Sequence, residues 1–385
     1  MAKVVVSGYM VRYPLSGLLL AYFQYVLGFH RLGHDVIYIE ESGWPDSCFN
    51  PETCRFGNDP APGLKTLRAL LAQFDASAVK VYYVERDTGA VHGGTSADVR
   101  RDLAEADLLL NLGGVCWLDE FMLCRHRVFV DMDPLFTQVG LFGAKLLGDY
   151  HVHLSYGVNI GKPQCTIPAA GYEWRGTVPP VIPEIWTPAP PAEAFTTVAH
   201  WSAYGAVEHD GKQFGQKDVE FLRLMNLPAL TTQKLELALS GGEEIRQTFR
   251  DAGWSVFDSE HLNNNLEQYR QYICSSRGEF SAAKNAYVQT HSGWFSDRTV
   301  CYLAASRPVV IQDVGAGDWL PTGRGVLTFS TIEEAAAQLA EVNSDYPGHC
   351  AEAREVAAQF FDYRKVLPRI LEMAPAGQLT PGAKP

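Results

Sequence analysis

Residues 277–314 read RGEFSAAKNAYVQTHSGWFSDRTVCYLAASRPVVIQDV, and this stretch says most about the fold. A short turn, SGWFSD, precedes a predicted helix over residues 298–305, and Ser296 or Asp297 suits its N-cap position. A Ser-Arg-Pro sequence ends the helix, and the apolar run VVIQD predicts a buried strand directly after it. A helix that leads straight into a buried strand is typical of a parallel α/β sheet.

The same alternation of strands and helices continues on both sides of this stretch. Apolar runs such as KVVVS (residues 3–7), DVIYI (35–39) and RVFVD (127–131) are separated by segments of helical length. The proline-rich segment 177–195 breaks the rhythm, because proline fits neither a helix interior nor a sheet interior. The rhythm then resumes. We therefore predict an α/β protein with two Rossmann-like, parallel-sheet domains facing across a cleft.

The expected domain boundaries follow from these breaks. Residues 1–180 form the first domain, 181–195 a stiff linker and 196–360 the second domain, and residues 361–385 form a helix and a flexible tail. Ligands of open parallel sheets bind beyond the carboxyl ends of the strands. The crevice between the two domains is therefore the expected site.

Charge and cysteine usage narrow the class of protein. The formal net charge of −12 over 385 residues disfavours broad binding to nucleic acid or to anionic membranes. The eight cysteines form no CxxC pair, which favours a reducing, cytoplasmic location without a structural zinc site. The apolar run at residues 15–29 is too short to span a membrane and contains Gln24, so we expect neither a membrane span nor a targeting peptide.

Several well-known catalytic motifs do not occur in the sequence. It contains no GxGxxG, GxxxxGK[ST], GxSxG or HExxH pattern. These absences count against a nicotinamide or flavin enzyme of the usual kind, a P-loop kinase or ATPase, and the hydrolases that carry such motifs.

The turn and helix start in residues 292–297 are candidates for binding a ligand. Free N–H groups and the helix dipole favour a diphosphate at such a position. Asp297 is alternatively suited to accept hydrogen bonds from ribose hydroxyls, and the simplest reading of Ser296 and Asp297 is a helix cap without a ligand.

The turn, the helix and the segment AASRPVV at residues 304–310 together resemble the C-terminal half of GT-B nucleotide-sugar glycosyltransferases of families 1 and 4. In that half a glycine-containing turn opens a helix, an acidic residue on the helix holds the ribose, and an ACGxPVV motif leads into the next strand. The usual glutamate position of the family falls on Cys301 here. The resemblance therefore implies that Asp297, one turn earlier, contacts the ribose, and that the last helix packs back on the first domain.

The resemblance also implies an activity. It predicts a glycosyltransferase (a hexosyltransferase) that moves a sugar from a nucleoside-diphosphate sugar, a UDP- or dTDP-sugar, to a hydroxyl or similar acceptor. The donor would bind the second domain and the acceptor the first, with no metal and no cofactor besides the co-substrate. The acceptor stays open between a small molecule, a glycan, a lipid and a modified base, and a homodimer is a possible assembly.

The candidate residues follow from these expectations. GT-B enzymes often bind the diphosphate with a basic residue after the first strand of the second half, where Lys212 is the first choice and Lys217 the second. The donor-binding candidates are Lys212, Arg277, Ser292, Gly293, Ser296, Asp297 and Arg298. An inverting transfer needs a general base near the acceptor hydroxyl. The catalytic candidates are Asp133, Asp131 and His291.

Two other classes of function stay open at this point. A nucleotide-sugar epimerase or hydrolase on the same scaffold would turn over the sugar nucleotide without an acceptor. A non-catalytic, two-lobed binding protein would hold its ligand without releasing a nucleoside diphosphate.

Overall fold

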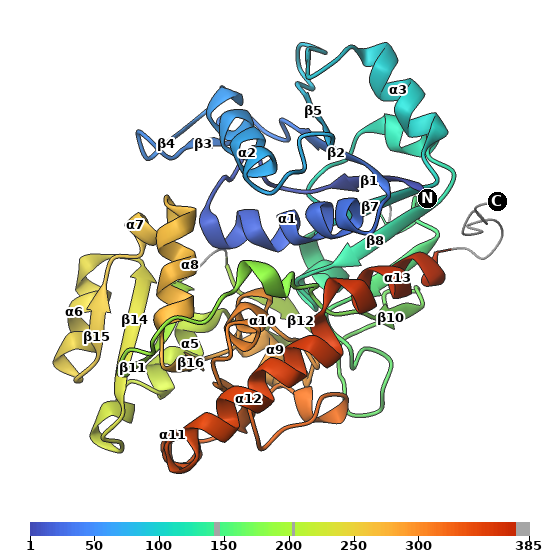
Figure 1. Cartoon of the computed structure of the whole chain (residues 1–385). Coiled ribbons are helices and arrows are strands. Elements are labelled where there is room, and N and C mark those ends of the chain that lie inside the picture. The colour runs from blue at the N-terminus through green and yellow to red at the C-terminus, as the bar shows by residue number, and fades with distance from the viewer. Residues whose placement is uncertain (142–146, 202–204, 375–385) are drawn as a thin grey trace, which may run out of the picture.

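The computed structural model describes residues 1–141, 147–201 and 205–374, which form two sheets that Figure 1 shows in blue to green and in yellow to orange. The first sheet has the strand order β10-β9-β8-β7-β1-β2-β5-β6, and the second has the order β15-β14-β11-β16-β17-β18. Neighbouring strands are parallel throughout, except β5 with β6. The prediction of two Rossmann-like, parallel-sheet domains is confirmed.

The first sheet is formed by β1 (Lys3–Ser7), β2 (Asp35–Glu41), β5 (Lys80–Val84), β6 (Val91–His92), β7 (Leu108–Leu112), β8 (Arg127–Asp131), β9 (Val152–Ser155) and β10 (Trp174–Gly176). The other elements of this domain are α1 (Ser16–Arg31), the hairpin β3 (Cys48–Asn50) and β4 (Arg55–Gly57), α2 (Ala61–Gln73), α3 (Ser96–Glu105), and short helical turns at Asp119–Leu123 and Thr137–Leu141. Every residue of β7 is buried, as expected for a parallel sheet covered on both faces. The helix expected over residues 134–147 falls partly outside the described residues.

The second sheet is formed by β11 (Ala194–His200), β14 (Lys234–Ser240), β15 (Ser255–Phe257), β16 (Gly278–Ser281), β17 (Val309–Gln312) and β18 (Val326–Phe329). Its helices are α5 (Lys217–Arg223), α6 (Glu243–Asp251), α7 (Glu260–Asn263), α8 (Leu266–Ser275), α9 (Asn285–Thr290), α10 (Asp297–Ala304), α11 (Ile332–Ser344) and α12 (Tyr346–Val356). A hairpin of β12 (Val207–His209) and β13 (Lys212–Phe214) precedes α5. Helix α10 and strand β17 correspond to the predicted helix and strand, with α10 beginning one residue earlier.

Helix α1 is buried along nearly its whole length, including every residue from Leu19 to Phe29. It packs against the first sheet and also against α8, α10 and α13 (Tyr363–Met373), so apolar side chains surround it on all sides. This burial explains why residues 15–29 superficially resemble a membrane segment. Among the described residues, no helix is both long and apolar enough to cross a bilayer.

The segment between the two sheets is packed into the protein and is not an open spacer. Val181, Ile182 and Trp186 are completely buried. The side-chain oxygen of Gln24 in α1 accepts hydrogen bonds from the backbone N–H of Ile182 (3.0 Å) and from the indole N–H of Trp186 (3.3 Å). Gln24, which interrupts the apolar run, thus holds the connecting segment in place.

Residues 361–373 return to the first domain. The N–H of Val181 donates to the carbonyl of Phe361 (2.7 Å), and the N–H of Tyr363 donates to the carbonyl of Val181 (3.0 Å). Helix α13 then crosses α1 so closely that a Cβ at Gly28 would lie 2.5 Å from Leu367 Cδ1. Figure 1 shows the red helices α12 and α13 running from the second domain to the first.

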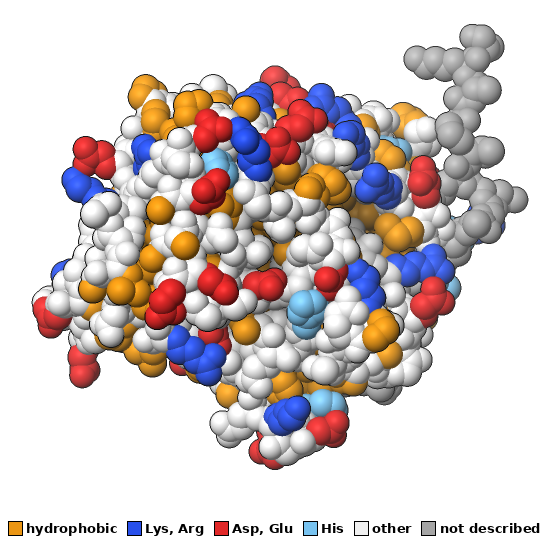
Figure 2. All heavy atoms as spheres, turned by 90° about the horizontal axis from the view of Figure 1, so that it is seen from below, with side chains coloured by type: hydrophobic (Ala, Val, Ile, Leu, Met, Phe, Trp, Pro, Cys, Tyr) orange, Lys and Arg blue, Asp and Glu red, His pale blue; other side chains and the backbone are white. Residues whose placement is uncertain are grey.

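Charged side chains of both signs are interspersed on the face that Figure 2 shows from below. Single-sign basic surfaces are the usual electrostatic basis of non-specific nucleic-acid binding. This face therefore offers no such surface.

Candidate functional site

The two domains meet where the carboxyl ends of their strands face each other. Asn159, after β9, donates its N–H to the carbonyl of Ser292 (3.1 Å) and its side-chain N–H₂ to the carbonyl of Gly315 (3.0 Å). The indole N–H of Trp294 donates to the carbonyl of Met132, after β8, at 3.3 Å. The crevice expected from the topology is therefore lined by loops from both sheets.

The N-terminus of α10 faces this interface. Ser296 is the N-cap residue, and its hydroxyl accepts a hydrogen bond from the N–H of Arg298 (3.2 Å). Burial raises the pKa of the adjacent Asp297 carboxyl, while the charges of Arg298 and Lys217 oppose that rise. The Asp297 carboxylate is thus partly desolvated, and the two nearby positive charges stabilise its ionised form.

The charge of Asp297 also acts on the first domain. Burial is the main cause of the raised pKa of three tyrosines near the interface, and Asp297 adds to it in each case. These tyrosines are Tyr22, Tyr25 and Tyr156. A Cβ at Gly8 would lie 2.5 Å from the Tyr22 ring, so the loop after β1 runs directly over Tyr22. Asp297 is therefore close enough to the first domain to act on a group bound between the two.

Lys217 begins α5, and its charge, after that of Arg298, is the second positive charge that opposes the rise in the pKa of Asp297. Burial, and secondarily the charge of Arg298, lowers the pKa of Lys217 to about 7. Asp297 and Glu279 act in the opposite direction. The charged form of a half-buried lysine near a second cation is strongly stabilised when an anion binds, because the anion supplies the missing counter-charge.

Lys212, the first choice from the sequence, does not join this group. It lies on the β12–β13 hairpin, where it pairs with His209 across the turn and is exposed to solvent. The hairpin lies between β11 and α5 in the chain. Lys212 on the hairpin is exposed to solvent, whereas Lys217 at the start of α5 is half-buried.

Arg298 is buried beneath the site and has internal partners. Its guanidinium contacts Glu279 Oε1 (2.7 Å) and donates to the carbonyl of Val198 (2.7 Å) and the hydroxyl of Ser281 (2.7 Å). Glu279 is completely buried, so Arg298 serves as its counter-charge. These contacts give Arg298 a structural role, and its expected contact with the donor stays a prediction.

Arg277 lies at the wrong edge of the sheet for donor binding. It precedes β16 and therefore stands at the amino end of that strand. Its side chain donates to Asn343 Oδ1 (2.8 Å), and its guanidinium carbon lies 4.1 Å from the ring centroid of Tyr346. Since ligands of parallel sheets bind at the carboxyl ends, Arg277 is corrected from a donor contact to a surface contact within the second domain.

Ser292 and Gly293 hold the domains together. The hydroxyl of Ser292 accepts a hydrogen bond from the N–H of Trp294 (3.2 Å), and the N–H of Gly293 donates to the carbonyl of Val314 (2.7 Å). Gly293 has φ +71°, and a Cβ there would lie 2.7 Å from Asn159 Cγ. The glycine is needed for close approach of the two domains, and its N–H is bonded to Val314. Its expected role in binding a diphosphate stays a prediction.

Asp131 is an interior residue and not an accessible base. It is completely buried at the end of β8. Its oxygens accept hydrogen bonds from Thr137 Oγ1 (2.6 Å), Ser155 Oγ (2.6 Å) and Gln138 Nε2 (2.9 Å), and burial raises its pKa. With both oxygens engaged, it organises the loop after β8 and does not contact an acceptor.

His291 is positioned by its neighbours at the end of α9. It adopts a left-handed conformation with φ 52°, and its Nε2 lies 2.9 Å from Asp318 Oδ2. Asp318 also accepts hydrogen bonds from Asn159 and Gln164 of the first domain, at 2.9 and 2.8 Å. The bond from Gln164, and then that of His291, lowers the pKa of Asp318. His291 thus belongs to a polar contact between the domains.

Asp133 is also engaged in contact between the domains. Its Oδ2 lies 2.6 Å from Lys284 Nζ, and its Oδ1 accepts a hydrogen bond from the Tyr287 hydroxyl. Both partners belong to the second domain. A carboxylate with both oxygens occupied in this way is poorly placed to take a proton from an acceptor.

We expect Asp133→Asn to change the rate of any reaction in this cleft by less than about tenfold, whereas removing a general base costs about 100- to 10,000-fold. Its main effect should be a loss of about 1 kcal/mol in the free energy of unfolding, because the ion pair is partly exposed. Urea denaturation and steady-state rates on the same samples measure both effects. A rate loss of a hundredfold at unchanged stability would restore Asp133 as the base.

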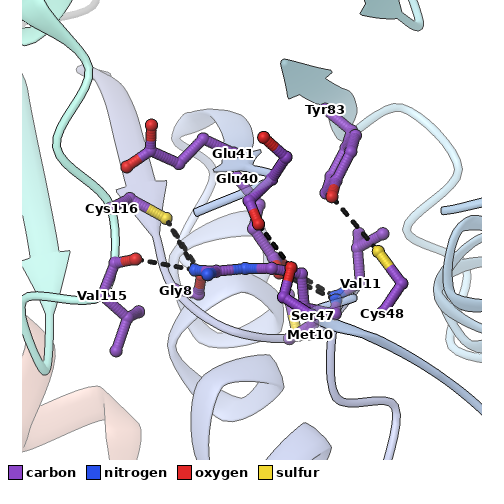
Figure 3. Close-up of polar contacts among 12 residues, drawn as sticks. Gly8, Met10, Val11, Glu40, Glu41, Ser47, Cys48, Tyr83, Val115 and Cys116 are labelled. Atoms are coloured by element: carbon purple, nitrogen blue, oxygen red, sulfur yellow. Dashed lines mark hydrogen bonds and ion pairs between the residues drawn. The ribbon is translucent and has the colours of Figure 1, made fainter. Parts of the chain in front are cut away.

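One buried polar cluster in the first domain has no counterpart among the sequence candidates. The carboxylate of Glu40, near the end of β2, accepts hydrogen bonds from the N–H groups of Val11 (2.7 Å) and Arg12 (2.8 Å) and from the Arg12 side chain (3.2 Å). Figure 3 shows Val115 and Cys116 on one side of this cluster and Cys48 and Tyr83 on the other. Arg12 and Glu40 are both completely buried. The pair fixes the loop after β1. In the sequence, only the two consecutive glutamates at the end of a predicted strand pointed to this cluster.

Within the described residues, no three histidine, cysteine, aspartate or glutamate side chains converge as ligands of a metal ion. Comparison with protein-family models and with curated proteins gives no match.

Solved structures do match over nearly the whole chain. An alpha-glucosyltransferase in complex with UDP aligns with a TM-score of 0.61 at 8% identity, covering 97% of this chain and 99% of that chain. HepE of Anabaena, in complex with UDP and glucose, aligns with a TM-score of 0.56 at 14% identity, covering 97% and 99%. AviGT4, a glycosyltransferase of avilamycin A biosynthesis, aligns with a TM-score of 0.52 at 13% identity, covering 97% and 96%. At these identities the likeness concerns the fold, and the expected GT-B fold is confirmed.

Proposed function

We propose that this protein transfers a sugar from a nucleoside-diphosphate sugar, with UDP as the favoured nucleotide, to an acceptor held by the first domain. The observation that carries the proposal is that Lys217, at the start of α5, and Asp297, at the start of α10, influence each other's pKa. Two of the solved structures with the same fold contain UDP, which supports the choice of nucleotide.

The chemistry of the proposed reaction suits these residues. Breaking the bond between the sugar and the diphosphate builds negative charge on the leaving group, and a cation aimed at that charge lowers the barrier. Lys217 supplies the cation, and the start of α10 adds the positive end of a helix dipole. Asp297 accepts hydrogen bonds from the ribose hydroxyls. In this proposal no metal or further cofactor takes part.

The cellular compartment, the oligomeric state and the roles of the domains are part of the same proposal. Eight free cysteines accord with a reducing compartment such as the cytoplasm. The homodimer stays a prediction, which light scattering of the purified protein tests. The first domain is proposed as the acceptor domain and residues 361–374 as part of the structure that joins the two.

Isothermal titration with UDP, dTDP and GDP tests the proposal. Binding of at least one of the three, with UDP tightest, is expected, and failure of all three to bind refutes the proposal. Product analysis with the UDP-sugar alone then separates sugar transfer from epimerisation or hydrolysis, because transfer needs an acceptor.

The affinity for UDP should fall as the pH rises from 7 to 9. Lys217 has a pKa of about 7 in the free protein, so raising the pH removes the charge that attracts the diphosphate. Binding then requires uptake of a proton, and the affinity falls by up to about tenfold per pH unit. Titration calorimetry in two buffers of different ionisation enthalpy measures the proton uptake directly. A flat affinity over this range would show that Lys217 does not contact the diphosphate.

A further inference from the structure

Five aromatic side chains form a continuous surface, the aromatic strip, on the loops around the carboxyl ends of β1 and β2. They are Tyr9, Tyr13, Trp44, Phe49 and Phe56. Successive ring centroids along the strip lie between 4.3 and 6.1 Å apart. Trp44 and Phe56 are 45% and 53% exposed, although exposed aromatic clusters are uncommon on a soluble protein without a ligand to cover them.

The buried pair of Arg12 and Glu40 supports the aromatic strip from below. The guanidinium carbon of Arg12 lies 4.4 Å from the Tyr9 ring centroid and 5.0 Å from that of Trp44. The carbonyl of Arg12 accepts a hydrogen bond from the N–H of Phe49 (2.7 Å), which fixes the β3–β4 hairpin to the same loop. Because these side chains are already fixed, they lose little conformational entropy when a ligand binds, and the free energy of binding is reduced less by that cost.

A hollow of about 240 Å³ is lined by residues that neighbour the aromatic strip in the sequence, including Ser42 and Cys48. Its lining includes Ser42, Ser47, Asn58, Glu85, Asp87 and Thr88. A hydrogen bond with His92 lowers the pKa of Glu85, so this carboxylate is ionised at neutral pH and accepts hydrogen bonds. The hollow therefore offers amide and hydroxyl groups on the same loops as the tilted rings, with carboxylates from the segment after β5.

We propose that the aromatic strip and this hollow bind a neutral oligosaccharide as the acceptor. The apolar C–H face of a pyranose ring packs on aromatic rings, while its hydroxyls donate to carboxylates and amides, and the two surfaces here supply these partners on neighbouring loops. This inference rests on the proposed transfer function for the role of acceptor, although the binding itself does not.

The arrangement of rings favours a chain of sugars over a flat aromatic compound. Successive rings are tilted by 31 to 59° and follow one another along an open surface. A flat aromatic compound binds best in a slot between facing rings, where both of its faces are covered. The acidic side chains of Glu85 and Asp87 oppose an anionic chain such as DNA or an acidic glycan.

An array of immobilised neutral oligosaccharides, uronic-acid oligosaccharides, single-stranded DNA and planar phenolic compounds tests the inference without any sugar donor. Binding to one or more neutral oligosaccharides is expected, and the double substitution Trp44→Ala/Phe56→Ala should weaken it at least about tenfold. Trp44→Phe should retain most of the binding, because the ring is kept. Met122→Ala, which removes a 51% exposed apolar side chain elsewhere on the same domain, is the matched control and should change nothing.

Titration of the same proteins with UDP separates this inference from the proposed function. Neutral oligosaccharide binding that is lost in the double variant supports the inference, whether or not UDP binds. UDP binding without any neutral oligosaccharide binding overturns it, as does preferential binding of DNA, acidic glycans or phenolic compounds. Equal loss of binding in Met122→Ala overturns it too, because the effect would then not be specific to the aromatic strip.

Discussion

Lys217→Met is expected to lower kcat/KM for sugar transfer by about 100- to 1,000-fold, the usual loss when a group that stabilises transition-state charge is removed. The loss should fall mainly on kcat, because the charge on the diphosphate grows as the bond to the sugar breaks. Methionine keeps the length and apolar character of the side chain, so the fold should survive. Circular dichroism and a thermal melt check that it does.

Lys212→Met is the matched control for this prediction. Lys212 lies five positions earlier, on the exposed β12–β13 hairpin. Its substitution by methionine removes the same positive charge from the chain. It should leave kcat/KM within about twofold, and Lys217→Arg should restore part of the activity through its retained charge. Comparable losses in the two methionine variants would mean that overall charge, and not Lys217 itself, attracts the donor.

Arg298→Met is expected to lower the free energy of unfolding by about 3–5 kcal/mol, because it leaves the buried carboxylate of Glu279 without its counter-charge. The Oε2 atom of Glu279 already lacks a hydrogen-bond partner among the described residues, and the more distant charge of Lys217 compensates only in part. Urea denaturation followed by tryptophan fluorescence measures the effect.

Two further variants show whether the loss comes from the unpaired charge. Arg277→Met removes the same kind of side chain from a half-buried position and should cost about 1 kcal/mol, because it loses one hydrogen bond and one cation–π contact. Glu279→Gln introduced together with Arg298→Met should recover part of the loss, since it removes the stranded charge. A loss of less than about 1 kcal/mol in Arg298→Met would contradict the structural role and favour a direct contact with the donor.

The architecture could be predicted from the sequence because it depends on local patterns. Runs such as KVVVS and RVFVD have three consecutive apolar residues at their centre, which is typical of a strand in a sheet covered on both faces. The turn before α10 carries its own cap in Ser296, so the start of that helix is also a local property. The packing of residues 181–186 into the core was missed, because the partner that fixes them, Gln24, lies far away in the sequence.

The candidate site was harder to predict, because contacts between residues far apart in the sequence decide which candidates reach the site. Lys212 and Lys217 look alike in the sequence, and only the formation of the β12–β13 hairpin separates them. The carboxylate that pairs with Arg298 lies on the neighbouring strand β16, nineteen residues earlier. Arg277 could have been excluded, however, because it precedes a strand and ligands bind beyond the opposite end.

The crossing of the chain at Val181 and Asp362 ties the two connections between the domains to each other. They run side by side and are bridged by backbone hydrogen bonds. Neither connection can shift alone without breaking that bridge. The two passages of the chain therefore act as a double strap, which fixes the spacing at which the facing loops meet.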